Sequence, residues 1–543
     1  MQNDSDIPIT QATPPADDSV PPYSWYALSV LVVIYVLNFI DRQIMSILAN
    51  DIKADLGIDD AYLGFLYGTA FAIFYALFGI PLGRLADSWK RVRLMTIGLT
   101  LWSAMTVISG FARDAATLTF ARVGVGVGEA SASPAAYSLI SDWFPARIRA
   151  TALAIYSSGI YIGGGLSLFI GGVIVESWNN AYPGGGPLDL VGWQAAFIAV
   201  GLPGLLLALW VITLKEPVRG ATDGIHTEED PHPFRGFFQE MMTVIPPFTI
   251  LGAAKRGKLA LAINLAVLSA LFVTAIAITN VLAMEQGRIL GLITDTITIA
   301  DQWLFMTIGC YAVFCWATNL RARDLPTFKL TWGSPAFLCT ILGYGTVAFI
   351  AYSASFFTAP YAERVFDISK ADLGLYVGGP SAVAGFAGVV LGGWMADALV
   401  KKYQAGRIFV ILFGLLSPVP VMMWQFSTSD LTTFLILAFF SGGLASSALG
   451  AAAASSQALV LPRMRGAATA TFFLSTTLVG LALGPFLAGY VSAQNGGDLA
   501  KGVTATLWIA PVGLCLLLAA IKLVPQAGKS MIARAKMAGE SGL

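Results

Sequence analysis

The chain alternates between long apolar blocks and short polar connections. Most blocks hold about 20 residues or more, the length that crosses the hydrocarbon core of a bilayer as one helix. Their apolar residues run on without the polar stripe of a surface helix. We find fourteen blocks, at residues 25–48, 61–82, 93–112, 115–141, 149–176, 192–214, 259–283, 301–320, 333–357, 372–396, 406–426, 430–456, 465–492 and 503–524. The pattern predicts an all-α integral membrane protein with fourteen spans.

The composition narrows the class of protein further. Of the 543 residues, 56% are hydrophobic and 12% are charged, whereas a soluble domain carries about 25% charged residues. This balance argues against a soluble multidomain enzyme. The formal net charge of +0 provides no overall basic field that would hold nucleic acid.

The distribution of Lys and Arg orients the spans. Loops on the side of the N-terminus, together with the block ends that adjoin them, hold 24 of the 32 Lys and Arg residues, the other side holds six, and Arg42 and Arg122 lie well inside spans. Basic loops stay in the cytoplasm, so we expect a multi-pass protein of the cell (inner) membrane with both termini cytoplasmic. Residues 1–24 lack the basic region and the cleavage site of a signal peptide. We expect a disordered tail there and a basic cytoplasmic tail at 525–543.

A repeat relates the two ends of the chain and indicates its organisation. Repeats in parallel order are typical of secondary transporters with two halves and a midplane substrate site between them. We therefore expect six-helix bundles at 25–214 and 333–524, separated by a cytoplasmic linker with an amphipathic segment at 215–258 and an inserted transmembrane helix pair at 259–320. At a spacing of 310 residues, Leu63-Gly64, Gly68, Gly83, Ala86-Asp87 and Arg91 recur as Leu373-Gly374, Gly378, Gly393, Ala396-Asp397 and Lys401.

Two motifs resemble those of the major facilitator superfamily. The loop Gly83-Arg84-Leu85-Ala86-Asp87-Ser88-Trp89-Lys90-Arg91 resembles the family's signature between its second and third helices. The run Arg122-Val123-Gly124-Val125-Gly126-Val127-Gly128 resembles its fourth-helix signature. The resemblance implies the major facilitator fold, in which two pseudo-symmetric six-helix bundles work by alternating access. That family has twelve helices, so the pair at 259–320 departs from its pattern.

A narrower resemblance is to the spinster branch of this family, which carries lysolipids and sphingolipids. Asn38-Phe39-Ile40-Asp41-Arg42 and the run from Arg122 through Gly128-Glu129-Ala130-Ser131 match that branch closely. Asp142-Trp143-Phe144, with Arg147 and Arg149, resembles its following loop, although organic-anion carriers have similar loops.

Asp41, Arg42, Arg122 and Glu129 lie inside predicted spans, where ionisable side chains are costly and often functional. The helical rise places Asp41 and Arg122 about 7–9 Å to the outer side of midplane and Glu129 close to it, so we expect Asp41 to pair with Arg122. A carboxyl holds its proton more tightly when desolvated and less tightly beside an arginine. Glu129 and Asp41 are therefore the proton-coupling candidates, and Arg42 and Arg122 are candidates for binding an anionic headgroup. The alternative is a static ion pair that only holds helices together.

The second half offers aromatic side chains where the first offers charges. Apart from Asp430 at the very start of the second one, blocks 333–357 and 430–456 contain no Asp, Glu, Lys or Arg. A cavity with one polar and one apolar wall suits an amphipathic ligand, and Tyr344 and Tyr352 are the substrate-binding candidates on the apolar wall; ordinary packing is the alternative for each ring. The aromatic residues of these blocks include Tyr344, Phe349, Tyr352, Phe356, Phe439 and Phe440.

The loop between the second and third blocks predicts a cytoplasmic latch. Asp87 can cap the start of a helix, and Arg91 can bind carboxylates or helix C-termini. Such contacts stabilise one closed state, and the alternative is a plain solvated loop. The gating candidates, which include a weaker second copy of the motif, are Gly83, Asp87, Arg91, Arg149, Asp397 and Lys401.

These features predict a proton-coupled secondary active transporter for an amphipathic lipid-like substrate of lysolipid or sphingoid type. A proton-coupled organic anion or drug transporter of the same fold is the alternative, and a membrane-embedded lipid-modifying enzyme fits less well. The four cysteines lie in apolar blocks, and His226 and His232 share one polar loop, so we expect no metal, cofactor or catalytic residue. The expected partners are the substrate, protons and membrane lipids, with no nucleic acid and the chain as a monomer.

Overall fold

The computed structural model describes residues 20–220, 222, 231–285 and 297–540. These residues form helices and connecting loops, with no strand among them. Within this described part, 13 helices are long and apolar enough to cross a membrane, so the all-α architecture predicted from the sequence is confirmed. The predicted tail up to residue 19 and His226 lie outside the described residues.

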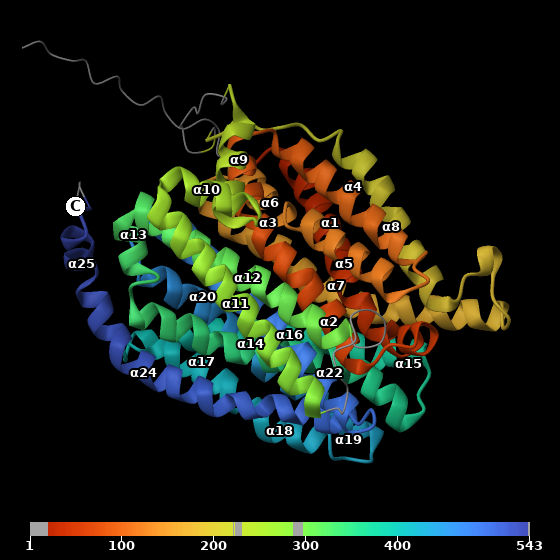
Figure 1. Cartoon of the computed structure of the whole chain (residues 1–543). Coiled ribbons are helices and arrows are strands. Elements are labelled where there is room, and N and C mark those ends of the chain that lie inside the picture. The colour runs from red at the N-terminus through yellow and green to blue at the C-terminus, as the bar shows by residue number, and fades with distance from the viewer. Residues whose placement is uncertain (1–19, 221, 223–230, 286–296, 541–543) are drawn as a thin grey trace, which may run out of the picture.

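The first half of the chain forms a bundle, red to yellow in Figure 1. Polar side chains mark where its helices begin: Asp59 accepts a hydrogen bond from the backbone N of Tyr62 at 2.8 Å, and Asp114 accepts one from Thr117 at 2.7 Å. Its helices are α1 (Pro22–Leu56), α2 (Asp60–Tyr67), α3 (Thr69–Ser88), α4 (Arg91–Ser109), α5 (Ala115–Glu129), α6 (Ala132–Trp143), α7 (Ala146–Ala181), the short η1 (Pro187–Asp189) and α8 (Gly192–Val211).

The block predicted at 115–141 is not one long helix. α5 ends at Glu129 and α6 begins at Ala132, so two shorter helices follow each other through Ala130 and Ser131. Together they cover the length of the predicted span. This break accounts for the difference between the fourteen predicted blocks and the 13 long helices in the described part of the chain.

The second half forms the other bundle, green to blue in Figure 1. Two π-helical segments, η3 and η5, interrupt its helices. Its elements are α13 (Leu325–Leu330), α14 (Pro335–Phe366), α15 (Lys370–Leu373), η3 (Gly374–Gly378), α16 (Gly379–Val400), α17 (Gly406–Leu416), α18 (Pro418–Gln425), α19 (Leu431–Ser446), α20 (Ala448–Ala458), η4 (Pro462–Met464), α21 (Arg465–Ser475), η5 (Thr476–Ala482), α22 (Gly484–Gln494), α23 (Leu499–Ala505), η6 (Thr506–Ile509), α24 (Ala510–Lys529) and α25 (Met531–Met537).

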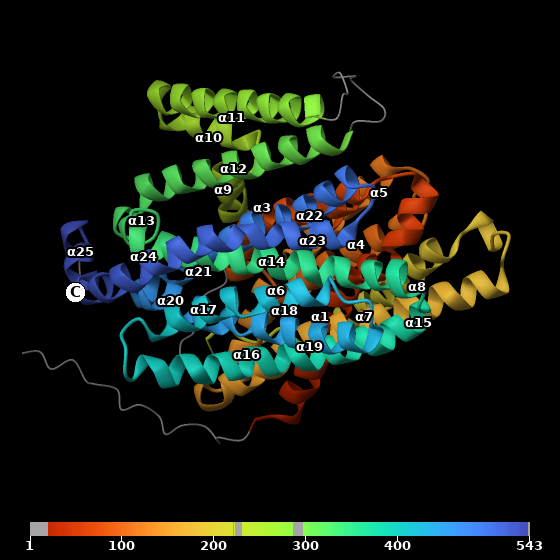
Figure 2. The ribbon, with the colours of Figure 1, turned by 90° about the horizontal axis from the view of Figure 1, so that it is seen from below.

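Between the halves in sequence, the described residues form four further helices. Two short ones, α9 (Pro233–Val244) and α10 (Phe248–Arg256), precede two long ones, α11 (Lys258–Glu285) and α12 (Ile297–Arg323). α12 lies between α11 and the rest of the molecule, and α11 is the outermost helix on this face (Figure 2). We call the end of the bundle with the α3–α4 loop the basic side, because its loops carry most of the Lys and Arg residues. The end with the α1–α2 connection is the opposite side.

Glycines of the predicted repeat pack the two seams between the halves. A Cβ on Gly64 of α2 would lie 2.2 Å from the carbonyl oxygen of Pro485. A Cβ on Gly378 of η3 would lie 2.4 Å from the carbonyl oxygen of Gly165 on α7. Neither position has room for a Cβ, so the repeat carries glycine where the backbones of the two halves touch.

The inserted helix α12 covers one of these seams. Its Gln302 is fully buried. The Thr69 hydroxyl of α3 lies 2.5 Å from Gln302 Oε1 and 2.6 Å from the carbonyl oxygen of Ala482 in η5. The Phe305 ring packs edge-on against Phe65, with 5.2 Å between centroids. α12 therefore contacts both halves at once.

Candidate functional site

Arg42 of α1 and Glu129 of α5 form an ion pair between helices. Arg42 Nη2 lies 2.7 Å from Glu129 Oε2, and Arg42 Nε donates to the same oxygen at 3.3 Å. The Glu129 side chain is fully buried and the Arg42 side chain is 12% exposed. Removing one partner of such a pair would leave a costly buried charge. The structure thus brings together one predicted proton-coupling residue and one predicted substrate-binding residue.

The predicted ion pair between Asp41 and Arg122 is wrong for this structure. Arg122 is 1% exposed, and its Nη1 donates to the backbone carbonyl of Asp41 at 3.4 Å instead of to the carboxylate. Nε and Nη2 of Arg122 and both carboxylate oxygens of Asp41 make no hydrogen bond of normal geometry with the described residues. Both side chains therefore lie buried, close together and incompletely satisfied.

The length of α1 explains this difference. The helix runs from Pro22 to Leu56, well beyond the predicted block 25–48. Its centre moves towards Asp41 by about 4 Å at 1.5 Å per residue. Arg42 then reaches the level of Glu129, and its long side chain pairs with the Glu129 carboxylate. Arg122, on the same helix as Glu129, does not form this pair.

Aromatic rings surround the two guanidinium groups. Arg42 Cζ lies 4.8 Å, 4.6 Å and 4.9 Å from the ring centroids of Phe39, Phe71 and Tyr75. Arg122 Cζ lies 5.5 Å from the centroid of the same Phe71 ring. A cation within about 6 Å of a ring face is attracted by its quadrupole. These rings hold the arginines in place without neutralising them.

The predicted aromatic candidates of the second half lie on α14. Tyr352 is close enough to Arg42 for an electrostatic interaction. Tyr344 is 7% exposed and stacks on Phe472, with 5.2 Å between centroids. Phe440, by contrast, is 54% exposed and does not belong to a buried wall.

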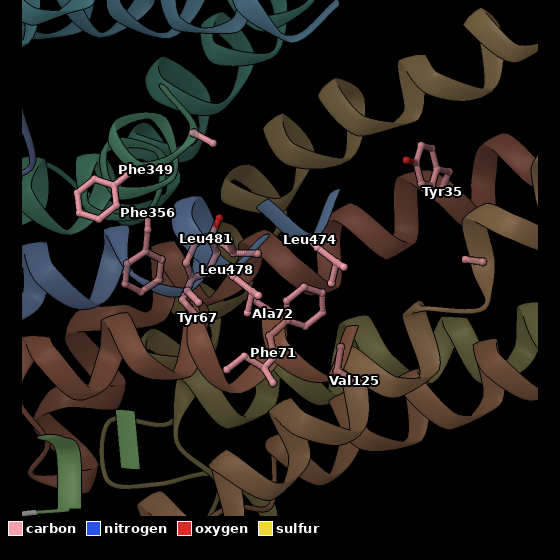
Figure 3. Close-up of a cluster of buried hydrophobic side chains, with 14 of the residues drawn as sticks. Tyr35, Tyr67, Phe71, Ala72, Val125, Phe349, Phe356, Leu474, Leu478 and Leu481 are labelled. Atoms are coloured by element: carbon pink, nitrogen blue, oxygen red, sulfur yellow. The ribbon is translucent and has the colours of Figure 1, made fainter. Parts of the chain in front are cut away.

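Buried apolar side chains from both halves meet beside the charged cluster. Figure 3 shows Phe71 and Val125 of the first half near Leu474 and Leu478 of the second. All four side chains are buried in one continuous hydrophobic core. The Phe71 ring also contacts the two arginines. The charged groups therefore sit at the edge of an apolar region that both halves build.

A second cluster, which the sequence analysis missed, joins the halves on the opposite side. Arg364 of α14 donates to both carboxylate oxygens of Asp60 on α2, at 2.7 Å and 3.0 Å. Lys53 and Ser492 also bind Asp60, at 2.9 Å and 2.7 Å. The Asp60 side chain is fully buried, so this is a desolvated contact between the first and second halves.

Further polar contacts join the two halves on the opposite side. Lys370 binds Asp51 at 2.9 Å and Glu363 at 2.6 Å. Next to Arg42 in sequence, Gln43 donates to Ser355 Oγ at 2.9 Å. These contacts link the C-terminal part of α1 to the second half, so the opposite side of the molecule is closed.

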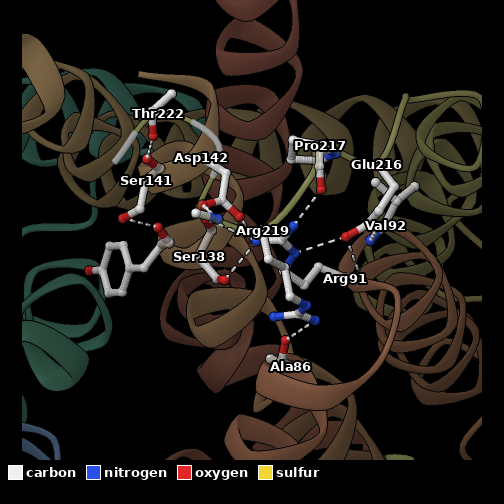
Figure 4. Close-up of polar contacts among 12 residues, drawn as sticks. Ala86, Arg91, Val92, Ser138, Ser141, Asp142, Glu216, Pro217, Arg219 and Thr222 are labelled. Atoms are coloured by element: carbon white, nitrogen blue, oxygen red, sulfur yellow. Dashed lines mark hydrogen bonds and ion pairs between the residues drawn. The ribbon is translucent and has the colours of Figure 1, made fainter. Parts of the chain in front are cut away.

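On the basic side, the predicted latch residue Arg91 binds within its own half. Its Nε donates to Glu216 at 2.8 Å, its Nη2 donates to the Pro217 carbonyl at 2.9 Å, and its Nη1 pairs with Asp142 (Figure 4). Ser138 Oγ accepts from Nη1 at 2.9 Å. The partners come from α6 and from the segment after α8, so this network stabilises the first half by itself.

The first-half gating candidates besides Arg91 make looser contacts. Asp87 is exposed at the end of α3 and forms no ion pair with another described residue. A Cβ on Gly83 would only touch Pro134, at 4.0 Å. Arg149 Nη2 donates to Thr222 Oγ1 at 3.3 Å.

In the second half, Asp397 and Lys401 are exposed near the end of α16 and in the loop that follows. The structure brings neither of them to the charged cluster. A gating role for the six candidates stays a prediction.

Arg463 joins three segments at the basic side of the second half. It donates to Asp324 at 2.7 Å and to Glu540 at 2.6 Å. Burial raises the pKa of Asp324, but hydrogen bonds from Arg463 and Thr327 outweigh it and hold this pKa below its usual value. The hydrogen bond from Arg463 likewise holds the pKa of Glu540 below its usual value. Among the described residues, no group of three His, Cys, Asp or Glu side chains could hold a metal ion.

Family membership follows from the comparison with known sequences. The model of the Major Facilitator Superfamily matches residues 31–350 and 337–536, which is nearly the whole chain. The chain therefore belongs to the major facilitator superfamily. The predicted fold of two six-helix bundles is confirmed, and so is the prediction of a transporter rather than an enzyme, because its relatives and structural neighbours are transporters.

Individual relatives refine the resemblance. An MFS-type efflux pump of Mycolicibacterium smegmatis is 25% identical over 509 residues, covering 94% of this chain and 92% of that protein. Protein spinster of Drosophila melanogaster is 29% identical over 223 residues, 41% of this chain and 35% of that protein. A crystal structure of a bacterial homologue of the human lysosomal transporter Spinster, inward-facing and unoccupied, aligns with a TM-score of 0.66 and 25% identity, covering 95% of this chain and 99% of that one. The resemblance to the spinster family is confirmed.

Proposed function

We propose that this chain is a proton-coupled secondary active transporter that moves an amphipathic, lipid-like substrate of lysolipid or sphingoid type by alternating access. The observation that carries the proposal is the buried Arg42–Glu129 ion pair beside Arg122 and Asp41. Ionisable side chains at this depth are expensive, and in membrane transporters they mark substrate and proton pathways.

Proton coupling is assigned to Glu129 and Asp41. Asp41 is fully buried without an ion partner in the described part of the chain, an environment that favours the protonated carboxylic acid. Glu129 holds Arg42 through one oxygen. Protonating Glu129 would weaken that pair and free Arg42, so proton binding and the availability of the arginine are linked.

The substrate headgroup is assigned to Arg42 and Arg122. Nε and Nη2 of Arg122 lack hydrogen-bond partners among the described residues, and a guanidinium binds phosphate or carboxylate in a bidentate manner. The apolar chain of the substrate would lie towards Tyr344 and Tyr352 of α14. One polar wall and one apolar wall thus support a molecule with a charged head and an acyl chain.

The conformation fits one step of alternating access. Polar contacts between the halves gather on the opposite side, whereas Arg91 binds within its own half on the basic side. With the basic side in the cytoplasm, as the Lys and Arg bias indicates, the halves are joined on the outer side, which is the arrangement expected of an inward-facing form. The bundles at 25–214 and 333–524 would rock about the charged cluster. The contacts that close the cytoplasmic side would come from the six gating candidates, Gly83, Asp87, Arg91, Arg149, Asp397 and Lys401. The chain would act as a monomer in the cell (inner) membrane.

A proton-coupled carrier of organic anions is the second candidate. Two buried arginines are also suited to a small acid, and a probable galactarate/D-glucarate transporter of Bacillus subtilis is 28% identical over 200 residues, 36% of this chain. The buried aromatic and aliphatic residues of the second half favour the lipid-like substrate.

Transport in proteoliposomes tests both candidates. A lysolipid, a sphingoid lipid and a small dicarboxylic acid are compared with and without a pH gradient, in the parent and in Glu129→Gln. We expect gradient-driven movement of a lipid by the parent and none by the variant, with Glu240→Gln on the surface helix α9 as the control. Transport of the small acid alone would replace the lipid proposal, and unchanged gradient-driven transport by Glu129→Gln would remove Glu129 from the mechanism.

A further inference from the structure

The inserted helices carry features that the transport cycle does not use. α11 exposes large apolar side chains along its length, as expected for a helix that faces lipid, whereas α12 is seated against both halves. Between the two helices lies an apolar groove of about 540 Å³, lined among others by Leu268, Phe272, Val273, Leu304 and Ile308. A groove of this kind accommodates acyl chains.

A smaller hollow lies on the basic side of the groove. It has a volume of about 150 Å³, and Lys255, Arg256 and Asn319 line it. Cys315 of α12 lines this hollow, and Tyr311, one turn earlier on the same helix face, lines the apolar groove. The two spaces therefore follow each other along the membrane depth, with the polar one nearer the bilayer surface.

The charges around the hollow favour an anion. Lys255 and Arg256 are exposed at the end of α10, Lys258 is exposed at the start of α11, and none of the three forms an ion pair with another described residue. The acidic residue of the adjoining helix α9, Glu240, already binds Arg323 at 2.8 Å. Basic pockets between transmembrane helices near the cytoplasmic surface bind anionic lipid headgroups.

We propose that this hollow and the groove between α11 and α12 form one binding site for an anionic two-chain phospholipid of the surrounding bilayer. The phosphate lies against Lys255 and Arg256, and one acyl chain lies between α11 and α12. The site is separate from the Arg42–Glu129 cluster and does not depend on the identity of the transported substrate. Its lipid would strengthen the attachment of the inserted pair to the bundle.

Photolabelling of the full chain in detergent tests the site. The probe is phosphatidylglycerol with a diazirine in one acyl chain, compared with phosphatidylcholine carrying the same chains, and labelled peptides are identified by mass spectrometry. We expect phosphatidylglycerol to label segments 268–273 and 304–311 in preference to the other lipid-facing helices. Equal labelling by phosphatidylcholine, labelling spread evenly over the lipid-facing helices, or cross-links between two copies through α11 would overturn the proposal.

Matched variants locate the headgroup. Lys255→Gln/Arg256→Gln removes two charges, each contributing about 1 kcal/mol near a membrane surface, and should weaken the apparent affinity roughly 30-fold. Lys522→Gln/Lys529→Gln removes two exposed charges from α24 and should leave labelling unchanged, as should Glu129→Gln. Inorganic phosphate should not compete with phosphatidylglycerol for labelling at concentrations that leave the fold intact. Two results would reject a lipid site here. One is phosphate that competes with phosphatidylglycerol at concentrations as low as those of the lipid, and the other is an equal loss of labelling in the α24 variant.

Discussion

Arg364 and Asp60 lie more than 300 positions apart in the chain, and their side chains meet in a bidentate contact with distances of 2.7 Å and 3.0 Å. The contact joins α14 of the second half to α2 of the first. Because Asp60 is fully buried, losing its carboxylate would leave the Arg364 guanidinium without its charged partner at this seam. Breaking such a pair typically costs roughly 3–5 kcal/mol.

Asp60→Asn should therefore destabilise the form that is closed on the opposite side. Spin labels on the ends of α2 and α14 should show a larger share of long distances than in the parent. Asp498→Asn is a suitable control, because Asp498 caps α23 on the same side without joining the halves and Asn also caps helices. Identical distance distributions for Asp60→Asn and the parent would mean that this pair does not hold the seam.

A double-mutant cycle should separate the two possible pairings in the buried cluster. Arg42→Gln and Glu129→Gln remove the same ion pair, so we expect their effects on thermal stability to be strongly non-additive, by about 0.5–3 kcal/mol. The side chains of Asp41 and Arg122 interact electrostatically but form no ion pair, and Arg122 donates only to the backbone carbonyl of Asp41 at 3.4 Å, so Asp41→Asn and Arg122→Gln should couple less. A larger coupling energy for the second cycle would contradict the pairing that the structure shows.

Two neighbouring glycines offer a test of seam packing. Gly378→Ala would place a Cβ 2.4 Å from the Gly165 carbonyl oxygen, whereas a Cβ on Gly379 would meet nothing within 4 Å. We expect Gly378→Ala to force α7 and η3 apart. The free energy of unfolding should fall by roughly 1–3 kcal/mol, as in overpacked cores, and the melting temperature should fall with it. Gly379→Ala should be neutral or slightly stabilising because alanine is the better helix former. Equal melting temperatures for the two variants would show that the seam can yield.

The contacts of Arg463 should depend on pH only in acid. The pKa values of Asp324 and Glu540 are lowered by their hydrogen bonds to Arg463, and the unfolded values are about 3.9 and 4.3. The stabilisation is therefore fully present above about pH 5 and is lost as the pH falls through the lowered pKa values, below about pH 4. Spin labels on α13 and α25 in a cysteine-free background should report a constant distance from pH 8 to pH 5 and separation in stronger acid. Arg463→Gln should release α25 at all these pH values, and Arg465→Gln should not; separation of the parent already at pH 6 would contradict the assignment.

Much of the architecture could be predicted because apolar length and the glycine repeat are properties of the sequence alone. Residues 42 and 129 were both recognised as functional candidates, yet their pairing was not predicted. Depth along a helix depends on where the helix ends, and α1 continues to Leu56 through a polar segment that hydropathy excludes. Which face of α1 meets α5 is set by packing and has no signature in one sequence.

The cluster around Asp60 was missed for a different reason. Lys53, Arg364 and Lys370 are three of the six basic residues on the opposite side, and their sequence pattern indicates only the orientation of the spans. Asp51, Asp60 and Glu363 lie at the ends of the same spans, and this coincidence of opposite charges was the available signal. Pairing them across the two halves requires the tertiary fold, because nothing in the local sequence says that α2 and α14 are neighbours.

The position of α12 makes the two flanks of the molecule unequal. On one seam, Thr69 and Leu478 are buried beneath the inserted helix. On the other, Phe169 of α7 and Tyr376 of η3 are 41% and 50% exposed. A lipid that diffuses sideways within the bilayer therefore meets α12 on one flank and, on the other, exposed aromatic side chains at a seam where the two halves contact each other directly.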